Sequence, residues 1–123
     1  MKRDMDLVRL ILLNLEKENT ASGLIDALQF KEYSPDQIVE HVNLLRDAGF
    51  IKSSEFSTGI FMIEVEGIAW NGYEFLDSIR DDATWSKTKE IANKCGGFTL
   101  DLLGEIAKGL IKTQVKKHTG VEF

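Results

Sequence analysis

Residues 44–51, which read LLRDAGFI, decide the predicted fold, because a helical pattern changes there into an apolar strand. Gly49 supplies the left-handed residue that often ends a helix, and Phe50 can fold back onto Leu45. The stretch therefore predicts that a helix ends near residue 48 and that a strand begins directly after it.

The start of the same helix is also well marked. Ser34 is a suitable N-cap, Pro35 occupies the first helical position, and Gln37 occupies the third. These signals predict a helix over residues 35–48. Its apolar side consists of Ile38, Val39, Val42 and Leu45.

The segments on either side of this helix are less uniform. Residues 4–18 have helical periodicity, with an aspartate in the first turn. Residues 24–33 fit either a short strand or one helical turn, and we favour a short strand or an irregular packing segment. After the helix, residues 51–57 and 60–66 predict a β-hairpin, because the second of these strands alternates apolar and mainly acidic positions.

Three further helices are predicted, over residues 70–82, 84–94 and 99–117. Thr84 or Ala83 is expected to cap the second, and the Gly-Gly pair at residues 96 and 97 separates it from the last. The aromatic residues of these helices fall at spacings that fit a hydrophobic core: Trp70, Tyr73, Phe75 and Trp85.

The order helix, short segment, helix, hairpin, helix is typical of a winged helix, an α+β fold with a two-stranded wing. We predict a winged-helix domain over residues 1–82 and two added C-terminal helices over residues 83–123. Residues 24–33 stand where such a domain has its second helix, so the helix-turn-helix is degenerate. The C-terminal extension either packs on the domain or mediates dimerisation, through an apolar face formed by Leu102, Leu103, Ile106, Leu110 and Ile111.

Two segments resemble a small bacterial and phage family known as domain of unknown function 2513. They are residues 1–7, MKRDMDL, and residues 69–82, AWNGYEFLDSIRDD, with Trp85 beyond. The resemblance covers most of the chain and implies a winged-helix fold and a phage or prophage setting. It implies no activity and no functional residues. Ala69 departs from the family pattern, which tends to have a threonine cap there.

Charge is unevenly distributed along the chain. The net charge is −5, with a charge of −8 on residues 1–82 and +3 on residues 83–123. An acidic body with a basic tail is unlike a typical whole-domain nucleic-acid binder.

The sequence offers little chemistry for catalysis. It has one cysteine and two histidines, and it contains no nucleophile-elbow, phosphate-loop, zinc-protease or dinucleotide-binding motif. We therefore expect a protein that is not an enzyme and has no metal or other cofactor. The apolar runs are too short for a signal peptide or a membrane span, which predicts a cytoplasmic protein without membrane contact.

Double-stranded DNA is one expected partner. A winged helix would place the helix over residues 35–48 in the major groove, where exposed polar side chains can read bases or contact phosphates. The candidate contact residues are Gln37, His41, Asn43 and Arg46 on this helix, Lys52 on the wing, and Lys2, Arg3 and Arg9 at the amino end.

Acidic residues weaken this prediction, since the same helix also carries Asp36, Glu40 and Asp47. The polar side of this helix is more readily explained as a solvated face. Two functions therefore stay open: a DNA-binding regulator, which we expect to be a dimer, or alternatively a protein-interaction adaptor that has lost DNA recognition and binds a host or phage protein.

Overall fold

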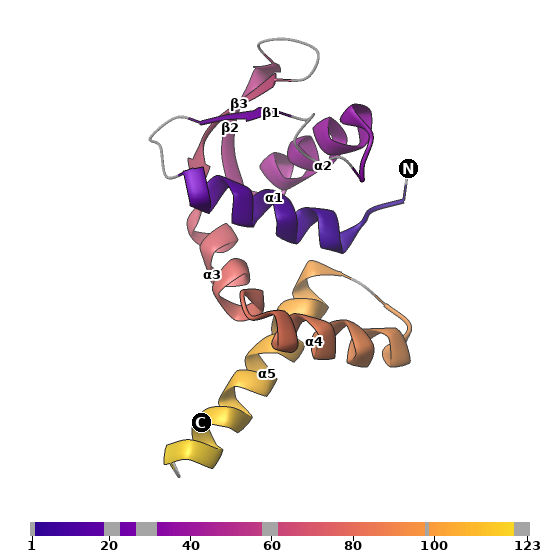
Figure 1. Ribbon diagram of the computed structural model, residues 1–123, viewed down its shortest axis with the longest axis vertical. Helices are drawn as coiled ribbons and strands as arrows, with labels where there is room; N and C mark the ends of the chain where they lie inside the picture. The colour runs from indigo at the N-terminus through magenta and orange to yellow at the C-terminus, as the bar shows by residue number, and fades with distance from the viewer. Residues whose placement is uncertain (1, 19–22, 27–31, 58–61, 98, 120–123) are drawn as a thin grey trace. The chain divides into compact units, whose positions relative to one another are not determined.

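The computed structural model describes residues 2–18, 23–26, 32–57, 62–97 and 99–119. The chain is an α+β protein with five helices and three strands in these ranges (Figure 1). In chain order the elements are α1 (Met5–Glu18), β1 (Gly23–Asp26), α2 (Pro35–Asp47), β2 (Ile51–Ser57), β3 (Met62–Ile68), α3 (Trp70–Ile79), α4 (Asp82–Cys95) and α5 (Leu100–Thr119).

The three strands form one antiparallel sheet in the order β1-β3-β2. β3 is the central strand: Gly23 of β1 pairs with Val65, and Ile51 of β2 pairs with Ile68. The predicted hairpin is therefore present, with β3 beginning at Met62. The segment favoured as a short strand, residues 24–33, includes all of β1 except Gly23, while residues 27–31 lie outside the described residues.

α1 begins at a local cap and packs across the sheet. The Asp4 carboxylate accepts hydrogen bonds from the backbone N–H groups of Asp6 and Leu7, at 2.9 and 3.2 Å, which satisfies donors that a helix start leaves unpaired. The helix contacts α2 and strands β1 and β3. Its fully buried side chains are Leu7, Ile11 and Leu12.

Both predicted ends of α2 are confirmed. The Ser34 hydroxyl accepts from the Gln37 N–H at 3.2 Å. At the other end Gly49 has a φ of +80°, and the Phe50 N–H donates to the Leu45 carbonyl at 2.9 Å. This left-handed residue turns the chain out of the helix and into β2.

The first turn of α3 lies unusually close to the start of β2. The Ala69 N–H donates to the Phe50 carbonyl at 2.9 Å, and Gly72 is buried beside it. A Cβ at Gly72 would collide with the Phe50 carbonyl oxygen and would lie 2.6 Å from Ile68 Cγ2. Glycine is therefore required here by space, because the helix backbone rests directly on the neighbouring backbone.

The boundary between α3 and α4 corrects the sequence prediction. α3 ends at Ile79, and Asp81 caps α4 by accepting from the Thr84 N–H at 2.8 Å. Thr84, one of the two predicted caps, lies inside the helix and is buried. The predicted Gly-Gly break is confirmed, since Gly96 ends α4 with a φ of +82°.

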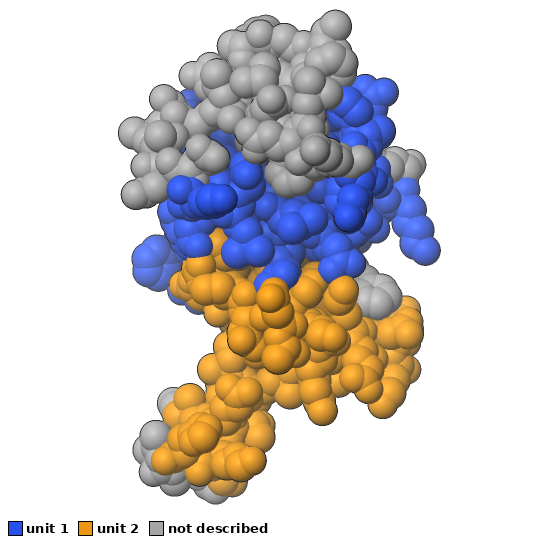
Figure 2. Space-filling view, viewed as in Figure 1, with its two compact units in different colours: residues 1–74 blue, residues 75–123 orange. Residues whose placement is uncertain are grey.

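The chain divides into two compact units, residues 1–74 and 75–123 (Figure 2). The division lies within α3, whereas the sequence boundary between residues 82 and 83 lies in the first turn of α4. Buried apolar residues of the first unit come from α1, α2, β2 and β3, and those of the second from α3, α4 and α5. In the second unit, α4 and α5 pack together.

Candidate functional site

The exposed side of α2 is mainly acidic. Asp36, Glu40 and Asp47 are exposed, and so is Leu44, with 38% of its surface accessible. These four residues recur at intervals of three or four, so they line one side of the helix; we call them the acidic face of α2. Among the predicted contact residues of this helix, Gln37, Asn43 and Arg46 are half-buried at its flanks.

Arg46 adds little positive charge to this face. Its Nη2 lies 3.4 Å from the Asp47 carboxylate, and its side chain is 23% exposed. The acidic face thus presents three carboxylates to solvent. Such a surface repels the phosphates that supply most of the affinity for DNA.

His41 corrects a sequence prediction, because its side chain was expected to be exposed and is only 1% exposed. The Asp4 N–H donates to His41 Nε2 at 2.9 Å, and His41 Nδ1 lies 2.7 Å from the Gln37 carbonyl oxygen. Since Nε2 accepts, the ring is neutral with its proton on Nδ1, which donates to that carbonyl. His41 therefore joins the residue that caps α1 to α2, and both of its ring nitrogens are used in hydrogen bonds within the protein.

Periodicity could have revealed this position. His41 follows Ile38 by three residues and precedes Leu45 by four, and both of these side chains are buried. On a helical wheel His41 falls on the buried side.

Tyr33 lies beside the same Asp4 carboxylate. Partial burial raises the pKa of the Tyr33 hydroxyl, and the neighbouring carboxylates of Asp4 and Asp6 raise it further. A hydrogen bond to the Asp4 side chain acts in the same direction. Asp4 thus caps α1, contacts α2 through its backbone N–H, and holds the residue that precedes the α2 cap.

The other predicted cations differ in exposure. Lys2, Arg3 and Lys52 are exposed, whereas Arg9 is half-buried in α1. Because the backbone of Asp4 is bonded to His41, the adjoining Lys2 and Arg3 are attached next to α2; we call these two residues the basic arm. The structure thus brings part of the predicted cationic set beside the predicted recognition helix.

α3 carries an exposed aromatic pair that the sequence prediction assigned to the core. Trp70 is 77% exposed and Tyr73 is 42% exposed, which corrects that assignment. Glu74 is exposed as well, and the three residues share one side of the helix because they are three or four positions apart. We call them the aromatic face of α3. Trp85 and Phe75, in contrast, are buried as predicted, at 4% and 5%.

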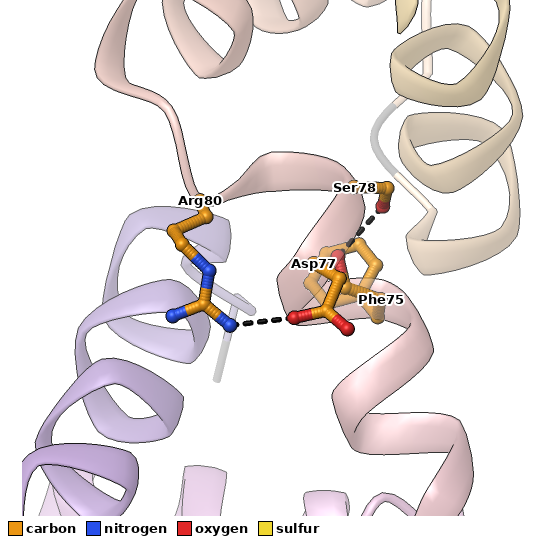
Figure 3. Close-up of polar contacts among 4 residues, drawn as sticks. All are labelled: Phe75, Asp77, Ser78 and Arg80. Carbon is orange, nitrogen blue, oxygen red and sulfur yellow. Dashed lines mark hydrogen bonds and ion pairs between the residues drawn. The ribbon is translucent and has the colours of Figure 1, made fainter.

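The second half of α3 is held by local polar contacts (Figure 3). Arg80 Nη2 donates to the Asp77 carboxylate at 2.5 Å, and the buried Ser78 hydroxyl donates to the Phe75 carbonyl at 2.6 Å. Asp77 continues the exposed side of α3 below Tyr73 and Glu74. Its charge is compensated by Arg80, which directly follows the end of the helix.

The predicted packing or dimer residues of α5 divide into two groups. Leu103 is fully buried, as is Ala107, in the unit where α5 packs on α4. Leu102, Ile106 and Leu110 are half-buried, and Ile111 is 36% exposed. The first half of α5 is therefore used in packing within its own unit.

The described residues offer few other sites. No group of three histidine, cysteine, aspartate or glutamate residues within them is arranged to hold a metal ion. Cys95 is a free thiol at the exposed end of α4. No helix in the described ranges is long and apolar enough to cross a membrane.

Comparison with known proteins finds relatives but no assigned activity. Residues 2–99 match the model of a family described as "Hypothetical protein (DUF2513)". An "Uncharacterized protein" of Haemophilus influenzae is 33% identical over 113 residues, which cover 90% of this chain and 96% of the relative. No solved structure matches the chain.

Proposed function

Because the chain belongs to the family described as "Hypothetical protein (DUF2513)", whose description assigns no activity, we propose a function from its surfaces. The protein is a non-enzymatic winged-helix module that binds a protein partner through the aromatic face of α3. The bacterial relative agrees with a bacterial or prophage setting.

The element order supports the winged-helix part of this proposal. α1, β1 and α2 precede a hairpin of β2 and β3, and the hairpin forms one sheet with β1. α2 then has the sequence position of a recognition helix and β2–β3 that of the wing. The turn at residues 32–34 leads directly into α2, in keeping with a degenerate helix-turn-helix.

The exposure of Trp70 and Tyr73 carries the functional proposal. A tryptophan that is 77% exposed leaves a large apolar surface in water. Tryptophan and tyrosine are enriched among the residues that dominate binding energy at protein interfaces. Glu74 beside them supplies a carboxylate, so the partner segment we expect carries an apolar side chain and a lysine or arginine.

Affinity capture with matched variants tests this proposal. Wild-type protein and a Trp70→Ala/Tyr73→Ala variant are incubated with lysate of the source cells, and bound proteins are quantified by mass spectrometry. We expect a partner that the wild type retains, the double variant loses, and a Lys87→Ala variant retains, since Lys87 is exposed on α4. Equal capture by all three proteins would exclude the aromatic face as the binding surface.

A second candidate function is DNA binding, and the position of the basic arm favours it. Lys2 and Arg3 adjoin Asp4, whose N–H bonds to His41 of α2, so exposed cations stand beside the predicted recognition helix. The arm could contact phosphates or enter a minor groove while α2 lies on the duplex. The three carboxylates of the acidic face oppose this docking.

Fluorescence anisotropy with a mixed-sequence DNA duplex, at low and at physiological salt, separates the two candidates. DNA binding would be established as the function if the affinity falls steeply with salt and is lost in a Lys2→Ala/Arg3→Ala/Lys52→Ala variant. The protein-binding proposal predicts no binding at physiological salt. It also predicts that Trp70→Ala/Tyr73→Ala leaves any weak low-salt binding unchanged.

A further inference from the structure

The acidic face of α2 has a definite pattern. Glu40, Leu44 and Asp47 are exposed at successive intervals of four and three residues, and each step along a helix advances about 1.5 Å. Leu44 therefore lies between the two carboxylates on one side of α2. An exposed leucine between acidic groups is suited to an apolar side chain flanked by cations.

The second half of α5 has the opposite charge in a corresponding pattern. Lys108 and Lys112 are exposed, and Ile111 between them is 36% exposed. These three residues share one side of the helix; we call them the basic face of α5. Lys108 and Lys112 lie away from the side that carries Leu103 and Ala107, whereas Ile111 continues that side at a four-residue interval and is exposed because packing involves the first half of α5. The helix can therefore pack on α4 and still present the basic face.

The two patterns agree in spacing when the helices run antiparallel. Leu44 precedes Asp47 by three residues, and Ile111 follows Lys108 by three. An alignment that sets Ile111 against Leu44 therefore sets Lys108 against Asp47. Lys112 then lies between Leu44 and Glu40. The antiparallel arrangement also places the two helix dipoles in opposite directions, which is electrostatically favourable.

We propose that the protein self-associates by placing the basic face of α5 of one copy along the acidic face of α2 of a second copy. A two-fold dimer repeats this contact twice, because each copy supplies one α2 and one α5. Opposite net charges of the two parts of the chain, −8 over residues 1–82 and +3 over residues 83–123, favour the encounter. This contact is separate from the aromatic face of α3.

Charge reversal combined with sedimentation equilibrium tests the proposal on the full chain. A Lys108→Glu/Lys112→Glu variant and a Glu40→Lys/Asp47→Lys variant each place like charges in the contact. We expect each to raise the dimer dissociation constant by about tenfold or more, with a similar loss for the wild type at high salt. The control for the first variant is Lys17→Glu/Lys87→Glu, which makes the same change of charge as Lys108→Glu/Lys112→Glu at exposed sites outside the contact.

Mixing the two reversed variants gives the sharpest outcome. In a heterodimer of the two, both contacts again join opposite charges, so we expect dimerisation to return to about the wild-type level. Circular dichroism verifies that each variant is folded. A monomeric wild type at every concentration, or a dimer that neither reversal weakens, would overturn the proposal. Either result leaves partner capture by the aromatic face to be judged by its own test.

Discussion

Among individual residues, the clearest result is that two side chains differ from prediction in their exposure to solvent. His41, expected at a binding surface, is buried between α1 and α2 with both ring nitrogens in hydrogen bonds. Trp70, expected in the core, is 77% exposed. A polar side chain can be buried where its hydrogen bonds are satisfied. An exposed tryptophan has no such compensation and therefore points to function.

The role of His41 predicts a loss of stability when it is replaced. His41→Ala removes the acceptor of the half-buried Asp4 N–H and leaves a cavity at a buried side chain, so we expect the free energy of unfolding to fall by about 2–3 kcal/mol. Glu40→Ala, at the exposed adjoining position, should change it by less than about 0.5 kcal/mol. Urea denaturation measures both. Equal small effects would show that His41 is not a structural link.

Tyr33 predicts a pH dependence at alkaline pH. Burial and the nearby carboxylates raise its pKa above the usual value of 10.0, so the folded protein holds this proton more tightly than the unfolded chain. The resulting contribution to stability is complete below pH 10 and decreases as the pH rises through the raised pKa. Urea denaturation at neutral and alkaline pH should show a smaller alkaline loss for Tyr33→Phe than for wild type. An identical loss in both proteins would contradict this role.

The two tryptophans form a matched pair for a third prediction. Trp85 is 4% exposed, so Trp85→Ala should lower the free energy of unfolding by about 3–5 kcal/mol. Trp70→Ala should change it by less than about 0.5 kcal/mol, because a surface substitution leaves no cavity. Thermal or urea denaturation of the two variants provides the comparison. A large destabilisation by Trp70→Ala would mean that Trp70 is a packing residue after all.

At the element scale, the parts that could be predicted are those whose signals are local. The ends of α2 are determined by residues directly beside them: Ser34 and Pro35 at the start and Gly49 at the end. The structure confirms each of these signals. The pairing of β1 with β3 could not be foreseen, because residues distant in sequence form its hydrogen bonds. The start of α4 was misplaced, since both Asp81 and Thr84 are acceptable caps locally.

Replacing Gly72 by alanine tests the close approach of α3 to β2, and Gly109 in α5 provides the control. Gly72→Ala would gain helix propensity, but its Cβ would collide with the Phe50 carbonyl, so we expect a net loss of stability. Gly109→Ala in α5 meets nothing within 4 Å and should stabilise the protein by up to about 1 kcal/mol. Chemical denaturation gives both values. A stabilising Gly72→Ala would contradict the close approach.

At the scale of the whole molecule, function depends on which surface is available to a partner. The α+β class and the helix–hairpin order could be predicted from the sequence, and the basic and acidic parts could be located by counting charges. The location of the binding site was not predicted, because the exposure of a side chain depends on which side of its helix packs inward. A wheel drawn for α3 separates Trp70, Tyr73 and Glu74 from the buried Phe75, Leu76 and Ile79, and this is the signal that identifies the aromatic face.

Site-specific photo-crosslinking tests directly whether the aromatic face of α3 binds a protein partner. A benzophenone amino acid at Asn71, which is exposed between Trp70 and Tyr73, leaves both aromatic residues in place, and crosslinking is performed in the source cells. We predict an adduct with another protein that disappears in the Trp70→Ala/Tyr73→Ala background and is not formed from a benzophenone at Lys87. An adduct that persists in that background, or the absence of any adduct specific to position 71, would contradict it.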